Sequence, residues 1–352
     1  YLMFMTLMIW RLVFYPVTHD TELSSYWMNT GAAAVTTVVG AALHQQVQIT
    51  GGPFIELLPF LKGFSLFFWA IGLWWLPFLI ILAIRKQVYG SRAIPFTVGY
   101  WEVVLSLSLY AAGTKQLTGL FDEHFIIRFS LYVSIAGALV YCSASAFTLA
   151  HLIVIPVWKA MPLQSLTIKW HSLRRGAIHI LQIAACSVSI RWFVTAMATI
   201  TMPLISSSHG YNQVSPGVGS STGRLLFSVT LFMVIKALLY YEELLRELLD
   251  PGKLHYSFSL VGIAALTGIC AFKLFGWHTV SYIFWYAAVV LWVGITLSSF
   301  TVLFLYRKSE DRKIEDILHG GWFFVTIGTQ FVALLSIEVA GQATGHTLLI
   351  QY

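Results

Sequence analysis

Residues 64–84, FSLFFWAIGLWWLPFLIILAI, contain no charged side chain and decide the fold class. An apolar helix of about 20 residues crosses the roughly 30 Å hydrocarbon core of a bilayer. In lipid only helices and closed barrels satisfy all of their backbone groups, and barrel strands alternate over only about 10 residues. This continuous run therefore predicts a membrane-spanning helix.

Similar runs recur along the whole chain, which has 352 residues, 58% of them hydrophobic and 10% charged. A soluble domain carries roughly 25% charged residues. We therefore predict an all-α integral membrane protein with a single transmembrane domain, 1–352. The predicted full spans are 26–45, 63–84, 97–114, 126–155, 187–205, 223–241, 256–275, 279–305 and 321–341.

Two further apolar fragments, 1–14 and 346–352, are each too short to cross a bilayer alone. Joined end to end they read HTLLIQYYLMFMTLMIWRLVF, one good span, which brings the prediction to ten helices. Because a chain rarely begins inside a membrane helix, we hypothesise a circular permutation, or a numbering that does not follow the biological order. The hypothesis predicts that Tyr352 and Tyr1 are neighbours within one helix.

The charges support the same division of the chain. Taken in cyclic order from Met161, most of the 21 Lys and Arg residues fall in every second connection between spans. Cytoplasmic loops carry an excess of Lys and Arg. The basic loops are therefore predicted to be cytoplasmic, in a multi-pass protein of the cell membrane. This bias also explains the net charge of +6, so no nucleic-acid partner is expected.

Residues that could bind a metal or form disulfides are scattered. Cys142, Cys186 and Cys270 lie in apolar stretches without CxxC spacing, which is typical of small buried hydrophobic residues. No HExxH motif and no paired histidine spacing occurs. We predict no metal, no cofactor and no catalytic residue.

An internal repeat runs through the odd-numbered spans of the cyclic order. Each opens with an aromatic residue and continues with Gly, Ala, Ser and Thr, whereas the even-numbered spans are rich in Leu, Ile, Phe and Trp. Small residues let helices approach closely, and hydroxyl groups can line water. The repeat favours five hairpins with the small-residue helices inside, around a pore; tight packing without a pore is the alternative. The five openings are IRWFVTAMATITM, HYSFSLVGIAALTG, GGWFFVTIGTQFVAL, SSYWMNTGAAAVTTVV and VGYWEVVLSLSLYAAGT.

Four of these stretches resemble one transporter family in cyclic order. They are SSYWMNTGAAAVTTVVGA at 24–41, GGWFFVTIGTQFVALL at 320–335, LLRELLDPGKLHYSFSLVGIAALTG at 244–268 and VGYWEVVLSLSLYAAGTKQL at 98–117. The chain resembles the tellurite-resistance/dicarboxylate transporter family, which includes plant slow anion channels and yeast malate and sulfite transporters. Residues 1–160 resemble the family's C-terminal half, and residues 161–352 its N-terminal half.

The resemblance implies a quasi-five-fold bundle of ten transmembrane helices, with the odd helices around a central pore, and usually a homotrimer. In the family's ninth span a Phe-Pro pair commonly closes the pore. Here Leu105 and Ser106 stand at the two positions. A leucine is smaller than phenylalanine, so either the gate is looser here or another residue closes it; simple packing of Leu105 is the alternative.

Other candidate pore-lining or anion-contacting residues follow from their chemistry. Glu102 lies one turn before Leu105 and could carry a proton alongside an anion, although a carboxylate at a helix start is also favoured by the helix dipole. Asn29 could offer a donor to an anion or to a neighbouring helix. Arg191 could attract anions to the inner mouth or extend to lipid headgroups. The remaining candidates are small residues of the repeat: Gly31, Thr199, Gly262, Thr326 and Gly328.

The function predicted from the sequence is passage of a small anionic substrate across a lipid bilayer through a pore in each subunit. The resemblance implies C4-dicarboxylates such as malate, or sulfite, tellurite, chloride or nitrate. One alternative is a proton-coupled secondary carrier of another fold, with inverted repeats and broken helices. An intramembrane enzyme or a receptor is less favoured, since no cluster of reactive groups and no signalling domain occurs.

Overall fold

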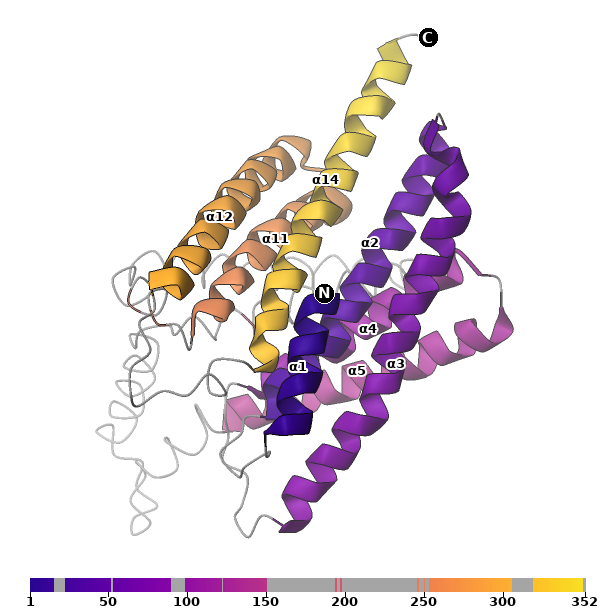
Figure 1. Cartoon of the computed structure of the whole chain (residues 1–352). Helices are drawn as coiled ribbons and strands as arrows, with labels where there is room; N and C mark the ends of the chain where they lie inside the picture. Colours follow the sequence, from indigo (N-terminus) through magenta and orange to yellow (C-terminus); the bar gives the residue numbers. More distant parts are fainter. Residues whose placement is uncertain are drawn as a thin grey trace, which may run out of the picture.

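The computed structural model describes residues 1–15, 23–51, 53–89, 99–121, 123–150, 253–305 and 319–350, together with Val194, Met197, Arg246 and Asp250. Within these ranges every regular element is a helix (Figure 1). Five of the described helices are long and apolar enough to cross a membrane. The α-helices are α1 Leu2–Phe14, α2 Met28–Thr50, α3 Leu58–Tyr89, α4 Tyr100–Thr118, α5 His124–Leu149, α11 Phe258–Phe275, α12 His278–Leu305 and α14 Phe323–Ile350.

Three hairpins pair a helix of small residues with a following helix of large ones: α2 with α3, α4 with α5, and α11 with α12. Side-chain size separates their positions. Nearly all of α11 is buried, whereas α3, α5 and α12 expose large side chains such as Trp74, Tyr132 and Val290. The predicted arrangement of small-residue helices inside and large-residue helices outside is therefore confirmed for these three hairpins.

The four small-residue helices pack side by side in the order α4, α2, α14, α11, and we call this row the inner arc (Figure 1). Close contacts at both ends of α14 show that it runs parallel to α2: Gly320, just before it, lies against Ser25, and Gly341 lies against Gln46. Ten helices and a five-fold pore remain predictions, because spans 187–205 and 223–241, apart from Val194 and Met197, lie outside the described residues.

Short 3-10 turns bring the starts of three inner helices together. They are η1 Leu23–Trp27 before α2, η5 Leu254–Ser257 before α11 and η6 Gly320–Trp322 before α14, and η6 contacts both of the others. A side chain at Gly320 would overlap the carbonyl of Ser25, and one at Gly321 would overlap the ring of His255. Glycine is therefore required at Gly320, where the obstacle is backbone, and a side chain at Gly321 would force the ring of His255 to move. We call this end of the inner arc the first-turn end.

The helix α1 lies along the start of α14. The far end of α14 shows that fragment 346–352 does not join fragment 1–14 as predicted. The ring of Tyr1 lies 5.6 Å from that of Phe323, whereas α14 continues as one helix through residues 341–345 to Ile350. At 1.5 Å per residue, Ile350 lies about 40 Å along the axis from Phe323.

The predicted break between span 321–341 and fragment 346–352 is therefore wrong, and residues 346–350 continue α14 rather than lying in one helix with residues 1–14. Tyr352, whose closeness to Tyr1 was predicted, lies outside the described residues. The stretch 341–345 contains no proline, and a glycine within a helix costs only about 1 kcal/mol, so nothing in it forces a turn. The cyclic order of the family segments stays a prediction.

Candidate functional site

A buried hydrogen bond joins the two ends of the inner arc. The Tyr256 hydroxyl, in η5 before α11, donates to Oε1 of Glu102 on α4 at 2.9 Å. Glu102 is 1% exposed and Tyr256 is 4% exposed. The main packing partners of α4 are α2 and α5, and those of α11 are α12 and α14. The bond therefore bridges the arc at its first-turn end rather than forming within a helix–helix interface.

Leu105 and Ser106, the predicted gate residues, are both fully buried one turn beyond Glu102. Ser106 faces α2, where its hydroxyl lies 3.6 Å from the sulfur of Met28 and close to Gly31. Gly31 and Ser106 therefore meet in the interface between α2 and α4, which gives both a packing role. A gating role for Leu105 and Ser106 stays a prediction.

The candidates on α11 and α14 gather in a second interface. A side chain at Gly328 would lie 3.0 Å from the carbonyl oxygen of Phe258, and one at Gly262 would touch Met197 and Phe331. Gly328 lets α11 and α14 approach closely, as small residues do in membrane bundles, and Gly262 leaves room for Met197 beside Phe331. Thr326 is also buried, at 7% exposure. The candidates thus fall into two helix interfaces, while Thr199 and Arg191 lie outside the described residues.

Asn29 begins α2 and binds a neighbouring helix. Its Oδ1 accepts the hydroxyl of Tyr1 at 2.7 Å, so the expected contact with another helix is present. Its Nδ2 atom is buried and has no hydrogen-bond partner in the described structure. The amide therefore keeps a donor for another group.

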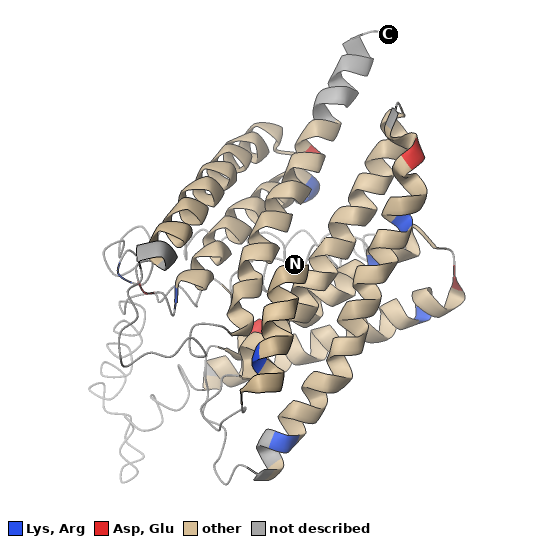
Figure 2. Cartoon of the chain, viewed as in Figure 1, with Lys and Arg blue, Asp and Glu red and all other residues tan. Residues whose placement is uncertain are grey.

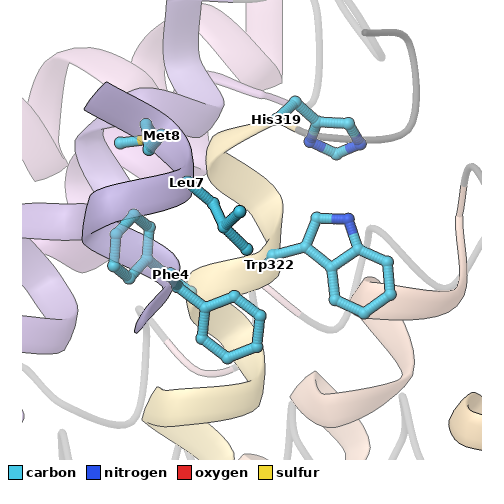
Figure 3. A pocket seen from close by; sticks show the side chains of 6 residues that line it. Phe4, Leu7, Met8, His319 and Trp322 are labelled. Carbon is cyan, nitrogen blue, oxygen red and sulfur yellow. The ribbon is translucent and has the colours of Figure 1, made fainter. Parts of the chain in front are cut away.

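A small pocket lies where α1 meets the start of α14. Figure 3 shows Phe4, Leu7 and Met8 of α1 on one side and His319 and Trp322 on the other. The pocket is partly open to the surface, has room for about one water molecule, and is apolar apart from the histidine. It is therefore too small to be a binding site for an anion as it stands.

Charged residues are sparse on the described helices, and most lie near a helix end (Figure 2). The far end of the bundle carries an ion pair, in which Nζ of Lys273 on α11 lies 2.6 Å from Oε1 of Glu338 on α14. The described residues contain no group of three or more His, Cys, Asp or Glu placed to hold a metal. Fixed charge is therefore largely absent from the middle of the inner arc.

Two of these contacts were missed by reasoning from the sequence. Tyr256 and Glu102 are 154 residues apart, so no spacing rule links them. Lys273 and Glu338 belong to different predicted spans, 256–275 and 321–341, so no spacing rule links them either. Only the parallel packing of the inner helices brings each pair together.

Comparison with known proteins finds one matching family model and several partial relatives. The family model described as voltage-dependent anion channel matches residues 1–149 and 187–352. An uncharacterized membrane protein of Mycobacterium tuberculosis is 31% identical over 113 residues, which are 32% of this chain and 56% of that protein. An uncharacterized transporter of Methanocaldococcus jannaschii is 25% identical over 137 residues, 38% of this chain and 37% of the transporter. The chain thus spans only part of the length of each relative, and no solved structure matches it.

Proposed function

The chain belongs to the voltage-dependent anion channel family, and from this premise we propose that it conducts small anions across a membrane along the inner arc. The observation that carries the proposal is the Tyr256–Glu102 bond across the first-turn end. One hydrogen bond links two helices that pack mainly on other partners, so that end can open without breaking a helix–helix interface. A gated path needs such a separable contact at its mouth.

The direction of the inner helices supports selection of anions. The N-terminus of a helix carries roughly half a positive charge from the aligned peptide dipoles. The helices α2, α11 and α14 begin beside one another. The fourth helix, α4, begins there too, because Glu102 in its first turn accepts the hydroxyl of Tyr256. The positive ends of four helices therefore gather at the first-turn end. Helix dipoles attract anions without fixed charges that would bind them too tightly to leave.

The finer features of the proposal come from the family resemblance and the charge pattern. We place the protein in the cell membrane with its basic loops cytoplasmic, as a homotrimer with one pore in each subunit. The proposed substrates are C4-dicarboxylates such as malate, or inorganic anions such as chloride, nitrate, sulfite or tellurite. Leu105 is the proposed constriction, since it lies one turn beyond the bond that bridges the arc.

A second candidate function, proton-coupled anion transport, is favoured by the burial of Glu102. An ionisable residue inside a membrane bundle is costly and usually functional. Protonation of the carboxylate would remove its charge and weaken the bond it accepts from Tyr256. In this version the same bridge opens when a proton arrives.

The experiment that tests the proposal measures anion flux into liposomes that contain the purified protein. Chloride, nitrate, sulfite and malate are compared with and without a pH gradient, for the wild type and for Leu105→Phe. We expect flux of at least one anion without a gradient, reduced about tenfold in Leu105→Phe, because a larger side chain narrows the proposed constriction. Flux that requires the pH gradient and is lost in Glu102→Gln would support the proton-coupled alternative.

The matched control is Leu139→Phe, the same substitution at a position of α5 that is 65% exposed. This variant is expected to conduct as the wild type does. Folded protein that passes none of the four anions would contradict the proposed function.

A further inference from the structure

Two histidines meet at the first-turn end. His255 belongs to η5 and is fully buried, and His319 is the N-cap of η6. Their ring centroids lie 4.3 Å apart, edge to face. Nδ1 of His319 accepts the backbone N–H of Gly321 at 3.1 Å. A neutral imidazole has one nitrogen that donates and one that accepts, so this bond requires a His319 whose Nδ1 carries no proton.

Gly321 connects these histidines to the bond that bridges the inner arc. A side chain at Gly321 would overlap the ring of His255, so the backbone of Gly321 rests directly on that ring. The ring of His255 lies in turn 4.0 Å from the ring of Tyr256, whose hydroxyl donates to Glu102. A continuous line of contacts therefore runs from Nδ1 of His319 to the carboxylate of Glu102.

A proton can reach His319 from outside the bundle. His319 is only partly buried and lines the pocket between α1 and the start of α14. This pocket is partly open to the surface and has room for about one water molecule (Figure 3). Histidine ordinarily changes its charge at about pH 6.5, which lies within the range of physiological acidification.

From this geometry we infer that His319 is a pH sensor that keeps the Tyr256–Glu102 bridge closed while its imidazole is neutral. A proton on Nδ1 excludes the bond from Gly321, because both nitrogens would then be donors. The arrangement with the bond therefore binds this proton more weakly than an arrangement without it, so acid favours the second. His319 acts through Gly321 and His255 and is a positioning residue. The inference rests on the proposed function for its effect on anion flux.

The charges around the two histidines offset one another. Among the described residues, the charged groups near the pair are Arg11 on α1, one turn beyond the pocket, Asp250 and Lys253 before η5, and Glu102 on α4, and the tyrosines are Tyr26 of η1 and Tyr256. The first turns of α2, α11 and α14 and the last described turn of α12 carry no ionisable side chain. Two positive and two negative groups leave neither sign dominant, so loss of the Gly321 bond decides the direction of the response.

The first test follows the melting temperature of the protein in a maltoside detergent by tryptophan fluorescence, from about pH 8 to about pH 5.5. The wild type should lose about 2–4 °C as the pH falls, the shift that one neutral hydrogen bond gives. His319→Asn keeps an oxygen that can accept from Gly321 and does not titrate, so it should lose less than about 1 °C. His319→Asp, whose carboxylate stays charged over this range, replaces His319→Asn if that variant does not fold.

The matched control is His124→Asn, the same substitution at an exposed histidine that begins α5, and it should show the wild-type loss. Glu102→Gln should show this loss too, because the bond between Gly321 and His319 does not involve the carboxylate. A loss that persists in His319→Asn overturns the inference, as does a wild type without any loss. A loss that Glu102→Gln alone abolishes would assign the sensor to the carboxylate instead.

Flux into liposomes tests the link to transport. Wild-type chloride flux should rise about fivefold from about pH 7.5 to about pH 5.5, the factor by which one neutral hydrogen bond shifts an equilibrium. His319→Asn should show no such rise, and a full rise in this variant would overturn control of flux by His319. Absence of flux in every variant would count against the proposed function, whereas the melting temperatures still test the sensor.

Discussion

The helices α11 and α12 follow one another in sequence and are both strongly apolar, yet one is almost wholly buried and the other mostly exposed. Their glycines show the difference. A side chain at Gly268 of α11 would lie 2.8 Å from Leu335, whereas one at Gly294 of α12 would meet nothing within 4 Å. In lipid, large apolar residues need no burial, and small ones allow helices to approach. Side-chain size, rather than hydropathy, therefore separates the inner helices from the outer ones.

The largest effect should come from a glycine between inner elements. In Gly320→Ala the added methyl group would overlap the carbonyl of Ser25, so the backbone must move, at a cost of about 3 kcal/mol. Gly294→Ala on α12 should instead stabilise the protein by about 0.5–1 kcal/mol, because alanine favours the helix and the site is open. Melting temperatures in detergent check both. Equal changes in stability for the two substitutions would contradict the difference in packing between inner and outer helices.

The two faces of α3 repeat this comparison within one helix. Trp69 faces α4, where its Nε1 donates to Oγ1 of Thr114 at 3.0 Å, and Trp74 is 82% exposed. Trp69→Phe should cost about 2 kcal/mol, since it leaves a small cavity and removes the hydrogen bond to Thr114, whose hydroxyl keeps its bond to the carbonyl of Tyr110. Trp74→Phe should change stability by less than about 0.5 kcal/mol. A clear loss of stability in Trp74→Phe would mean that another protein surface covers Trp74. The subunit interface of the proposed homotrimer would be one such surface.

Much of this architecture could be predicted from single residues. Runs such as residues 64–84 predicted helices, and the alternation of small and large residues predicted which helices lie inside. The continuation of α14 to Ile350 could not be predicted, because a Gly-containing stretch without proline permits either a turn or a helix. The Tyr256–Glu102 bond could not be found either, because it depends on where two distant helices start relative to each other.

The bridge across the first-turn end should have a moderate effect on stability and a larger effect on flux. Tyr256→Phe removes the donor to Glu102 and should cost about 1.5 kcal/mol, the usual value for a hydrogen bond to a carboxylate. Anion flux in liposomes should rise, because the contact that joins the ends of the arc is lost.

A double-mutant cycle of Tyr256→Phe and Glu102→Gln separates the energy of this hydrogen bond from the other effects of each substitution. The double variant should lose less stability than the sum of the single variants, since both remove the same bond. Strict additivity would show that the two side chains do not interact, and decreased flux in Tyr256→Phe would contradict a closing role.

The smallest effect is expected at the far end, where the ion pair between Lys273 and Glu338 contrasts with the buried bridge. Opposite charges join α11 and α14 there, but the side chain of Lys273 is 41% exposed, so water screens the pair. Lys273→Gln should therefore cost less than about 1 kcal/mol, and the difference should shrink at high salt. Lys115→Gln, at the end of α4, is the control of equal charge. A loss of about 3 kcal/mol at Lys273 that persists in salt would show a desolvated pair. The far end would then be closed as firmly as the first-turn end, and the path would need gates at both ends.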